Sequence, residues 1–160
     1  MSGGFIVSGV TTCPVDGLTV RTFAEDGVHR FPSRCKRARA VELVIHETVT
    51  RSVDSTIAVL KKRGLSVHLV MDADGALTQH GDLATDILWH ASQHNGASFG
   101  VEVVTPYYPS YLKPGLPWDR VIKAPWAHKG QYVLPTPAQA EAVAALVRWT
   151  TSAPAPGIAV

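Results

Sequence analysis

Two ionisable side chains interrupt or end apolar segments, and such positions are the first candidates for catalytic or ligand-binding residues. His46 follows the run Val41–Ile45, and Glu102 lies inside the apolar segment Phe99–Thr105. A histidine at a strand end is well placed to bind a ligand or exchange a proton, although a histidine bonded to nearby backbone is the alternative. A carboxylate within an apolar strand either faces solvent from an edge strand or is partly buried with a raised pKa and needs a partner.

The segments around these residues predict strands and one helix. The nearly continuous aliphatic run 41–45 is typical of a strand covered on both faces. A helix should follow, with Ser52 or Asp54 as its N-cap and Gly64 at its end. Segments 65–71 and 76–79 predict a hairpin around a tight Asp-Ala-Asp-Gly turn, and segment 99–105 predicts the strand that carries Glu102.

A second helix is predicted near the end of the chain. Thr136 is its expected N-cap, and Gln139 completes a capping box. The helix should end near residue 152, before two prolines, and its expected buried stripe is Ala140, Val143, Leu146, Val147 and Thr150. The order strand, helix, hairpin, strand, helix predicts an α/β fold with a central mixed β-sheet flanked by helices.

Residues 1–160 are predicted to form a single domain with two unusual parts and an abrupt end. Short β-type runs at 5–10 and 18–23 suggest that residues 1–40 are an N-terminal β-rich extension. Six prolines and several aromatic residues within 106–135 predict an ordered insertion loop without regular structure. The last four residues resemble the approach to another strand, so we expect the domain to be C-terminally incomplete.

Composition excludes several function classes. The net charge is +2, from 15 basic and 13 acidic residues, which gives no electrostatic reason to expect nucleic-acid binding. No apolar run approaches the roughly 18 residues of a membrane-spanning helix, so no membrane insertion is expected. The first ten residues lack the features of a signal peptide, so we expect synthesis in the cytoplasm.

Two small groups of residues leave alternatives open. Cys13 and Cys35 are too few for a disulfide scaffold, and are interpreted as free thiols or as one disulfide. A basic cluster (Arg34, Lys36, Arg37 and Arg39) is interpreted as part of a solvated loop, or as a contact to an acidic polymer.

Several motifs in the same order resemble a known family. The segments VELVIHETVT, LSVHLVMDADGALTQHGDLATDILWHASQHNGASFGVEVV and TPAQAEAVAALVRW look like the zinc-dependent N-acetylmuramoyl-L-alanine amidases of the type 2 class. These enzymes share their fold with peptidoglycan recognition proteins. The resemblance runs from about Val41 to Trp149, and segment 106–135 is an unusual insertion within it.

The resemblance implies roles for particular residues. His46 matches the first zinc ligand, and Glu102 matches the general acid/base of the glutamate-type branch. Other branches place a tyrosine where this chain has Val67, so an active enzyme would depend on Glu102. Trp89 and His90 match a pair that lines the substrate groove and contacts the glycan or the stem peptide, with a purely structural role as the alternative.

The implied chemistry is hydrolysis of the amide bond between N-acetylmuramic acid and L-alanine. Bound Zn²⁺ would polarise the carbonyl and lower the pKa of a water toward ~7, while Glu102 would move the proton. In the family the other two zinc ligands follow the last helix, whereas here no His, Cys, Asp or Lys follows it. His128 precedes that helix and does not match a missing ligand, and His68 is expected to pack rather than to catalyse.

Three functions are therefore weighed. The first is a peptidoglycan hydrolase, a lytic enzyme of a phage or a bacterium that acts on the cell wall. The second is an inactive peptidoglycan-binding module with the same fold. The third is a structural component of a phage tail or another assembly, in which the aromatic residues of the insertion form a partner surface (Tyr107, Tyr108, Tyr111, Trp118 and Trp126).

Overall fold

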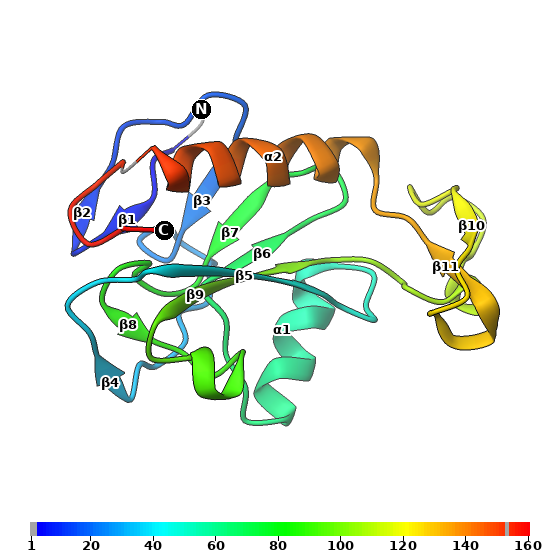
Figure 1. Cartoon of the computed structure of the whole chain (residues 1–160), viewed down its shortest axis with the longest axis horizontal. Helices are drawn as coiled ribbons and strands as arrows, with labels where there is room; N and C mark the ends of the chain where they lie inside the picture. The colour runs from blue at the N-terminus through cyan, green and yellow to red at the C-terminus, as the bar shows by residue number, and fades with distance from the viewer. Residues whose placement is uncertain (1–2, 153) are drawn as a thin grey trace.

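A central mixed β-sheet with a helix on each face forms the framework of the protein (Figure 1). The computed structural model describes residues 3–152 and 154–160. The sheet order is β3-β7-β6-β9-β5, and neighbouring strands are parallel except in the β6–β7 hairpin. The predicted α/β fold, a helix-flanked mixed sheet, is confirmed.

The bounds of the elements are as follows. The strands of this sheet are β3 (Val20–Thr22), β5 (Glu42–Glu47), β6 (Leu69–Met71), β7 (Leu77–Gln79) and β9 (Ser98–Val103). Shorter pairs are β1 (Ile6–Val7) with β2 (Val10–Thr11), β4 (Cys35–Lys36) with β8 (Asp86–Ile87), and β10 (Val121–Lys123) with β11 (Gln131–Val133). The helices are α1 (Val53–Lys62) and α2 (Pro137–Thr151), and short 3₁₀ turns cover Ser92–His94, Pro109–Tyr111 and His128–Gly130. Within the described ranges, neither α-helix combines the length and apolar character needed to cross a bilayer.

Both helices begin where the sequence predicts. Ser52 caps α1 by accepting a hydrogen bond from the backbone N–H of Ser55, and Thr136 caps α2 in the same way through Gln139. Gly64 follows α1 with a φ of +67°, a backbone conformation that favours glycine. These local signals are read from a few adjacent residues, which is why sequence analysis recovers them.

The two faces of the sheet carry separate apolar cores. The core under α2 contains Leu69, Met71 and Val101, and the core under α1 contains Val70 and Val104. The N-terminal residues belong to this arrangement, because buried side chains from them join the core under α2 and β3 is an edge strand of the sheet (Phe5, Val7, Leu18 and Val20).

Two predictions about burial are wrong. The strand at 41–45 was expected to be covered on both faces, but β5 is the outer strand of the sheet and Ile45 is 44% exposed. The expected stripe of α2 is correct for the buried Leu146 and Thr150 and for Val143, which packs against the core, but wrong for the exposed Ala140 and Val147. The other buried residues of α2 are Gln139, Ala142 and Ala145. Apolar residues occur around most of α2, so their spacing alone does not define the buried side.

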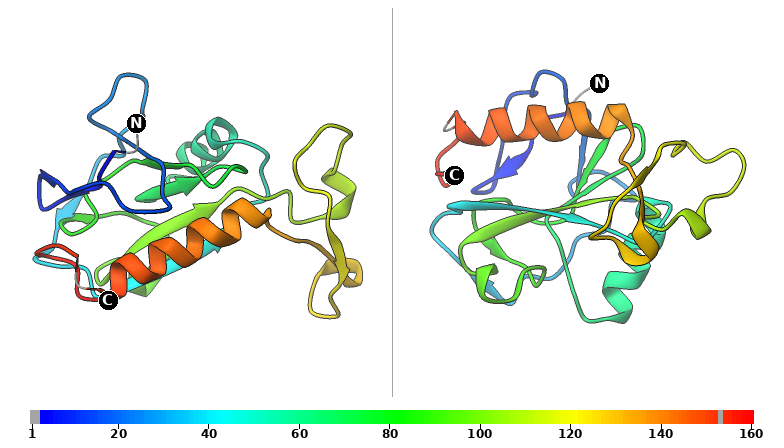
Figure 2. Two further views of the ribbon diagram at one scale, coloured as in Figure 1. Left: turned by 90° about the horizontal axis from the view of Figure 1, so that it is seen from above. Right: turned by 45° about the vertical axis from the view of Figure 1, so that its right-hand side comes forward.

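Segment 106–135 contains regular structure, contrary to the prediction. It forms an arm that extends away from the sheet, and its β10–β11 hairpin pairs Val121 with Val133 (Figure 2). The prolines flank the paired residues instead of interrupting them, which is how the hairpin forms despite their number. Trp118 anchors the arm in the core under α1.

The remaining expectations concern thiols, charge and the chain end. Cys13 and Cys35 are both free and exposed. Arg37 is not a solvated loop residue, because its guanidinium donates to the carbonyls of Leu83, Ala84 and Ser98, and burial lowers its pKa to about 10. Beside the start of β5, a parallel bridge joins Ala40 to Ile158, the first of the last three apolar residues of the sequence.

Candidate active site

His46 and Glu102 lie side by side on the face of the sheet that α1 covers. β5 and β9 are parallel neighbours, and their register pairs His46 with Glu102. Paired residues on neighbouring strands point to the same face, with the strands about 5 Å apart. The alternation along β9 agrees, because Val101 and Val103 belong to the core under α2 and Glu102 therefore faces the other way. The sheet brings together the two residues that the sequence singled out.

Glu102 is a partly buried carboxyl group with high proton affinity. Burial raises its pKa to about 7, and the positive charge of Arg63 at the end of α1 opposes part of this rise. The side chain lines a cavity of about 210 Å³ between α1 and the end of β5. Within the described chain its oxygens make no hydrogen bond and are not sealed from solvent. A carboxyl group with a pKa near 7 can take up and return a proton at neutral pH.

His46 contacts a second histidine. Its Nε2 lies 3.3 Å from Nδ1 of His90, and the two rings meet edge to face with centroids 5.5 Å apart. Burial lowers the pKa of His46, which favours the neutral ring. Nδ1 of His46 has no partner in residues 3–152 and 154–160, yet it is not among their sealed polar atoms, so it reaches solvent. A neutral imidazole with an accessible nitrogen is a ligand type that Zn²⁺ accepts.

His90 is held in place by the backbone of β9. Its ring lies over Gly100, where any Cβ would overlap it. Its Nε2 is 3.3 Å from Oγ of Ser98, and burial lowers the pKa of His90 to about 4, with the charge on His46 as a smaller cause. The contact between His46 and His90 joins residues 44 positions apart, and no local sequence pattern signals it.

His68 is a structural residue, as its sequence context suggested. Its ring is fully buried, with Nε2 2.9 Å from the carbonyl of Asp86 and Nδ1 accepting from the backbone N–H of Gly100. Burial lowers its pKa to about 3. With both nitrogens engaged by backbone, His68 is held neutral and has no lone pair for a ligand.

Trp89 does not line the cavity that Glu102 lines. Its ring is 46% exposed and carries the guanidinium of Arg34 4.6 Å from its centroid. The ring lines a different cavity, of about 260 Å³, beside Ser66. The structure therefore separates Trp89 from His90 spatially, although the two are adjacent in sequence.

The donors for a metal ion are incomplete in the described chain. Residues 3–152 and 154–160 contain no group of three His, Cys, Asp or Glu side chains arranged to hold a metal. His128 lies on the arm, where its ring packs against Tyr108. A catalytic zinc takes three protein ligands, so His46 fits one ligand position but the described side chains do not make up the set.

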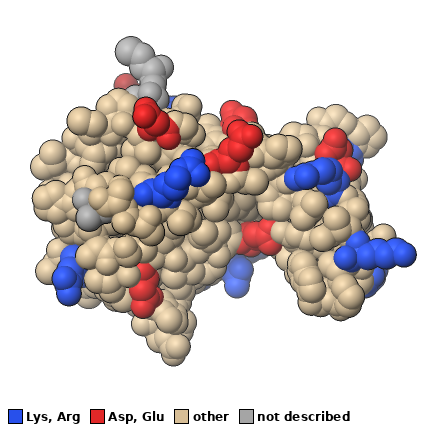
Figure 3. Space-filling model, turned by 45° about the horizontal axis from the view of Figure 1, so that its top comes forward, with Lys and Arg blue, Asp and Glu red and all other residues tan. Residues whose placement is uncertain are grey.

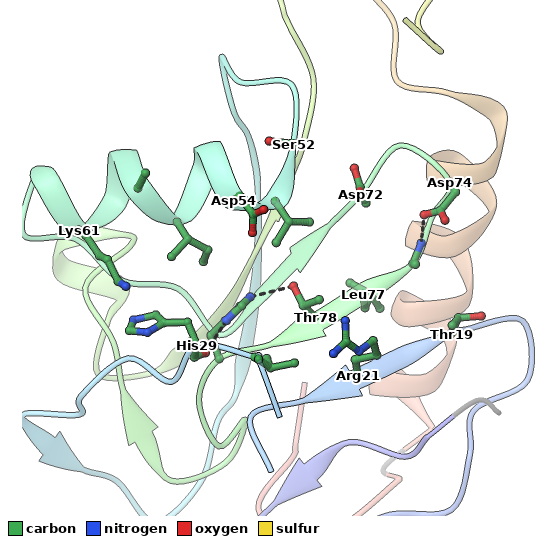
Figure 4. A pocket seen from close by; sticks show the side chains of 17 residues that line it. Thr19, Arg21, His29, Ser52, Asp54, Lys61, Asp72, Asp74, Leu77 and Thr78 are labelled. Atoms are coloured by element: carbon green, nitrogen blue, oxygen red, sulfur yellow. Dashed lines mark hydrogen bonds between the residues drawn. The ribbon is translucent and has the colours of Figure 1, made fainter. Parts of the chain in front are cut away.

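A larger cavity lies elsewhere on the α1 face. Figure 4 shows it between α1, β7 and β3, with Lys61 and His29 on one side and Asp72 and Asp74 on another. Its volume is about 630 Å³, and it contains none of the predicted site residues. Nε2 of His29 is buried there without a hydrogen-bond partner among the described residues. Sequence analysis did not single out this cavity, because loops and strands far apart in the chain line it.

The arm also reaches the candidate site. The hydroxyl of Tyr132 on β11 donates a hydrogen bond to Glu47, which directly follows His46. Burial raises the pKa of Glu47 and the bond from Tyr132 lowers it in part.

On the face drawn in Figure 3 the basic and acidic side chains are interspersed over the described residues, with no large patch of one sign.

Comparison with known proteins identifies the family. Residues 37–157 match the family model described as N-acetylmuramoyl-L-alanine amidase. No curated protein matches. Among solved structures, the chain is similar to Drosophila peptidoglycan recognition protein PGRP-SA, with 14% identity, a TM-score of 0.55, and coverage of 84% of this chain and 73% of that one.

Two further structures are similar in fold. One is a mutant of Drosophila PGRP-LB in complex with tracheal cytotoxin, with 13% identity, a TM-score of 0.53, and coverage of 81% of this chain and 72% of that one. The other is the Escherichia coli N-acetylmuramyl-L-alanine amidase AmiD in complex with anhydro-N-acetylmuramic acid-L-Ala-D-γ-Glu-L-Lys. There the identity is 20%, the TM-score 0.51, and the alignment covers 80% of this chain and 52% of AmiD. Since the family model spans most of the sequence, this chain belongs to the N-acetylmuramoyl-L-alanine amidase family.

Proposed function

We propose that this protein hydrolyses the amide bond between N-acetylmuramic acid and L-alanine in peptidoglycan. The observation that carries the proposal is the pairing of Glu102 with His46 on one face of the sheet, beside a cavity that admits solvent. Family membership supports the substrate class, and the E. coli relative was solved with a muramyl peptide bound. Because this substrate is a wall polymer, we propose a lytic enzyme of a phage or a bacterium, made in the cytoplasm and acting on the cell wall.

In the proposed reaction, Glu102 transfers the proton and His46 would bind the metal ion. Glu102, with a pKa near 7, accepts a proton from the attacking water and returns it to the leaving nitrogen of L-alanine. Its oxygens have no hydrogen-bond partner among the described residues, so both are available for this transfer. Zn²⁺ is the proposed cofactor, which would supply Lewis acidity, with Nδ1 of His46 as one ligand. We propose that His90 contacts part of the muropeptide.

The test replaces Glu102 with Gln. The variant keeps the size of the side chain but cannot accept a proton, so release of peptide from purified peptidoglycan with added Zn²⁺ should fall about 10²- to 10⁴-fold. Mass spectrometry of the products identifies the cleaved bond. The matched control is Glu42→Gln, which changes a carboxylate on the neighbouring strand β5 that pairs with His94 instead, and should keep wild-type activity.

An alternative function is peptidoglycan binding without hydrolysis. The incomplete donor set among the described side chains favours it. Sedimentation with insoluble peptidoglycan would then show binding, while no peptide would be released at any Zn²⁺ concentration. Release of peptide by wild-type protein and its loss in Glu102→Gln would exclude this alternative.

A further inference from the structure

We propose that His90 is a positioning residue that keeps His46 in one tautomer, with the proton on Nε2 and the lone pair on Nδ1. The proposal deepens the proposed function, because it names the atom of His46 that faces the reaction site. A chain of hydrogen-bond contacts supports it, because each donor in the chain requires the next atom to be an acceptor.

The chain of contacts begins at a backbone carbonyl. Ser98 Oγ lies 2.7 Å from the carbonyl oxygen of His94, which can only accept, so the Ser98 hydroxyl proton is used there. Nε2 of His90 lies 3.3 Å from the same Oγ, so Nε2 must be the donor in this second contact. In a neutral ring the remaining nitrogen of His90, Nδ1, is then an acceptor.

The next contact transfers this constraint to His46. Nδ1 of His90 faces Nε2 of His46 at 3.3 Å, and two lone pairs would repel each other there, so His46 must carry its proton on Nε2. Its Nδ1 then has the lone pair and, as shown above, reaches solvent. The neutral state of His90 agrees with its location, because its ring is enclosed by the rings of His46 and His68 and lies on Gly100, without a carboxylate among its contacts.

This arrangement has a physical use. A histidine that binds a metal or accepts a proton through one nitrogen is oriented by the hydrogen bond that its other nitrogen donates. A free imidazole populates both tautomers, so locking one of them ensures that the lone pair always points outward. Gly100 is part of the device, because only a residue without a Cβ leaves room for the His90 ring.

The experiment is NMR of the metal-free full chain with ¹⁵N-labelled histidine, at about pH 7.5, above the usual histidine pKa of ~6.5. Long-range ¹H–¹⁵N correlations distinguish protonated from unprotonated ring nitrogens, and single His→Gln variants assign the signals. We expect His46 and His90 each to be protonated on Nε2 alone, with a slowly exchanging proton on His46. A proton on Nδ1 of His46 would overturn the proposal.

Variants separate positioning from a merely structural role. His90→Phe removes the acceptor, and we expect the Nε2 proton signal of His46 to be lost and its two ¹⁵N shifts to move toward an averaged value. Unchanged shifts in this variant would contradict the proposal. The control His128→Gln alters an imidazole on the arm and should leave His46 unchanged.

A milder variant covers the case in which His90→Phe does not fold. Ser98→Ala removes the acceptor for Nε2 of His90, so the fixed tautomers of both histidines should become mixtures. If both stay as in the wild type, the contact chain does not control them. Added Zn²⁺, as a probe, should shift Nδ1 of His46 and leave its Nε2 protonated. These readouts need no hydrolysis, so they stand apart from the test of the proposed function.

Discussion

Burial, not a neighbouring acid, gives the carboxyl group of Glu102 its high proton affinity. Desolvation disfavours the charged form, and Arg63 recovers only part of the cost. A catalytic base at neutral pH needs such a pKa, because it must bind a proton and then release it. The same burial therefore serves the proposed chemistry and lowers the stability of the folded chain once Glu102 ionises.

This cost predicts a pH dependence of stability. The pKa of Glu102 is about 7 in the folded chain and 4.5 ordinarily, so the folded state binds more protons between these values. The contribution of Glu102 to the free energy of unfolding should thus fall as pH rises from about 4.5 to 7, by up to about 3 kcal/mol, and then level off. The buried histidines His68 and His90, whose pKa values are lowered, contribute in the opposite direction. Urea unfolding of the wild type and of Glu102→Gln at several pH values isolates this contribution, because the stability of the wild type relative to the variant should fall between pH 4.5 and 7.

The control for this measurement is Glu42→Gln, which should keep the wild-type slope. If wild type and Glu102→Gln unfold with the same pH dependence, Glu102 titrates near its ordinary value and burial does not tune it. In that case its suitability as a base at neutral pH would also be lost.

At the scale of elements, Gln139 connects the parts that meet behind the site. Sequence analysis identified it as the capping-box residue of α2, and the structure adds three long-range bonds to that role. Its side-chain oxygen accepts from the indole N–H of Trp118 in the arm, and its amide donates to the carbonyls of Asp72 and Val104. The β6–β7 turn, the arm and the end of β9 are thereby tied to one buried side chain.

Gln139→Ala should destabilise the chain by about 3 kcal/mol, because it leaves the buried indole N–H of Trp118 and the buried carbonyl of Val104 without partners. Chemical denaturation measures the loss. The matched control Gln131→Ala removes an exposed glutamine on β11 and should change stability by less than about 0.5 kcal/mol. Equal effects of the two substitutions would show that the three long-range bonds of Gln139 contribute nothing to stability.

The local capping role of Gln139 was predicted from the sequence, whereas its long-range hydrogen bonds were not, and the same division holds for the rest of the fold. Caps, the glycine turn and the strand around Glu102 depend on residues close in the chain, and these predictions were confirmed. The contact of His46 with His90 and the outer position of β5 depend on how strands pair across the fold. Nothing in the local pattern at 41–45 distinguishes an outer strand from a central one, so its burial was predicted wrongly.

At the scale of the whole molecule, the candidate site lies at the outer strand of the sheet. His46 is on β5, whose other side has no strand partner in the described residues apart from the bridge between Ala40 and Ile158 just before it. The sheet therefore provides few further side chains that could bind a metal ion together with His46. This placement agrees with the absence, among the described residues, of a group of three metal-binding side chains.

Zinc binding by the 160-residue chain should accordingly be weak. With one histidine ligand instead of three, little of the 10–16 kcal/mol of a complete structural site is available. Titration should show a dissociation constant weaker than about 1 μM, abolished by His46→Ala, and a chelator should leave the melting temperature unchanged. Wall hydrolysis should rise with added Zn²⁺ and disappear on desalting. His128→Ala, which changes a histidine on the arm, should bind as the wild type does. Stoichiometric zinc retained through dialysis against a chelator would show that other side chains complete the site.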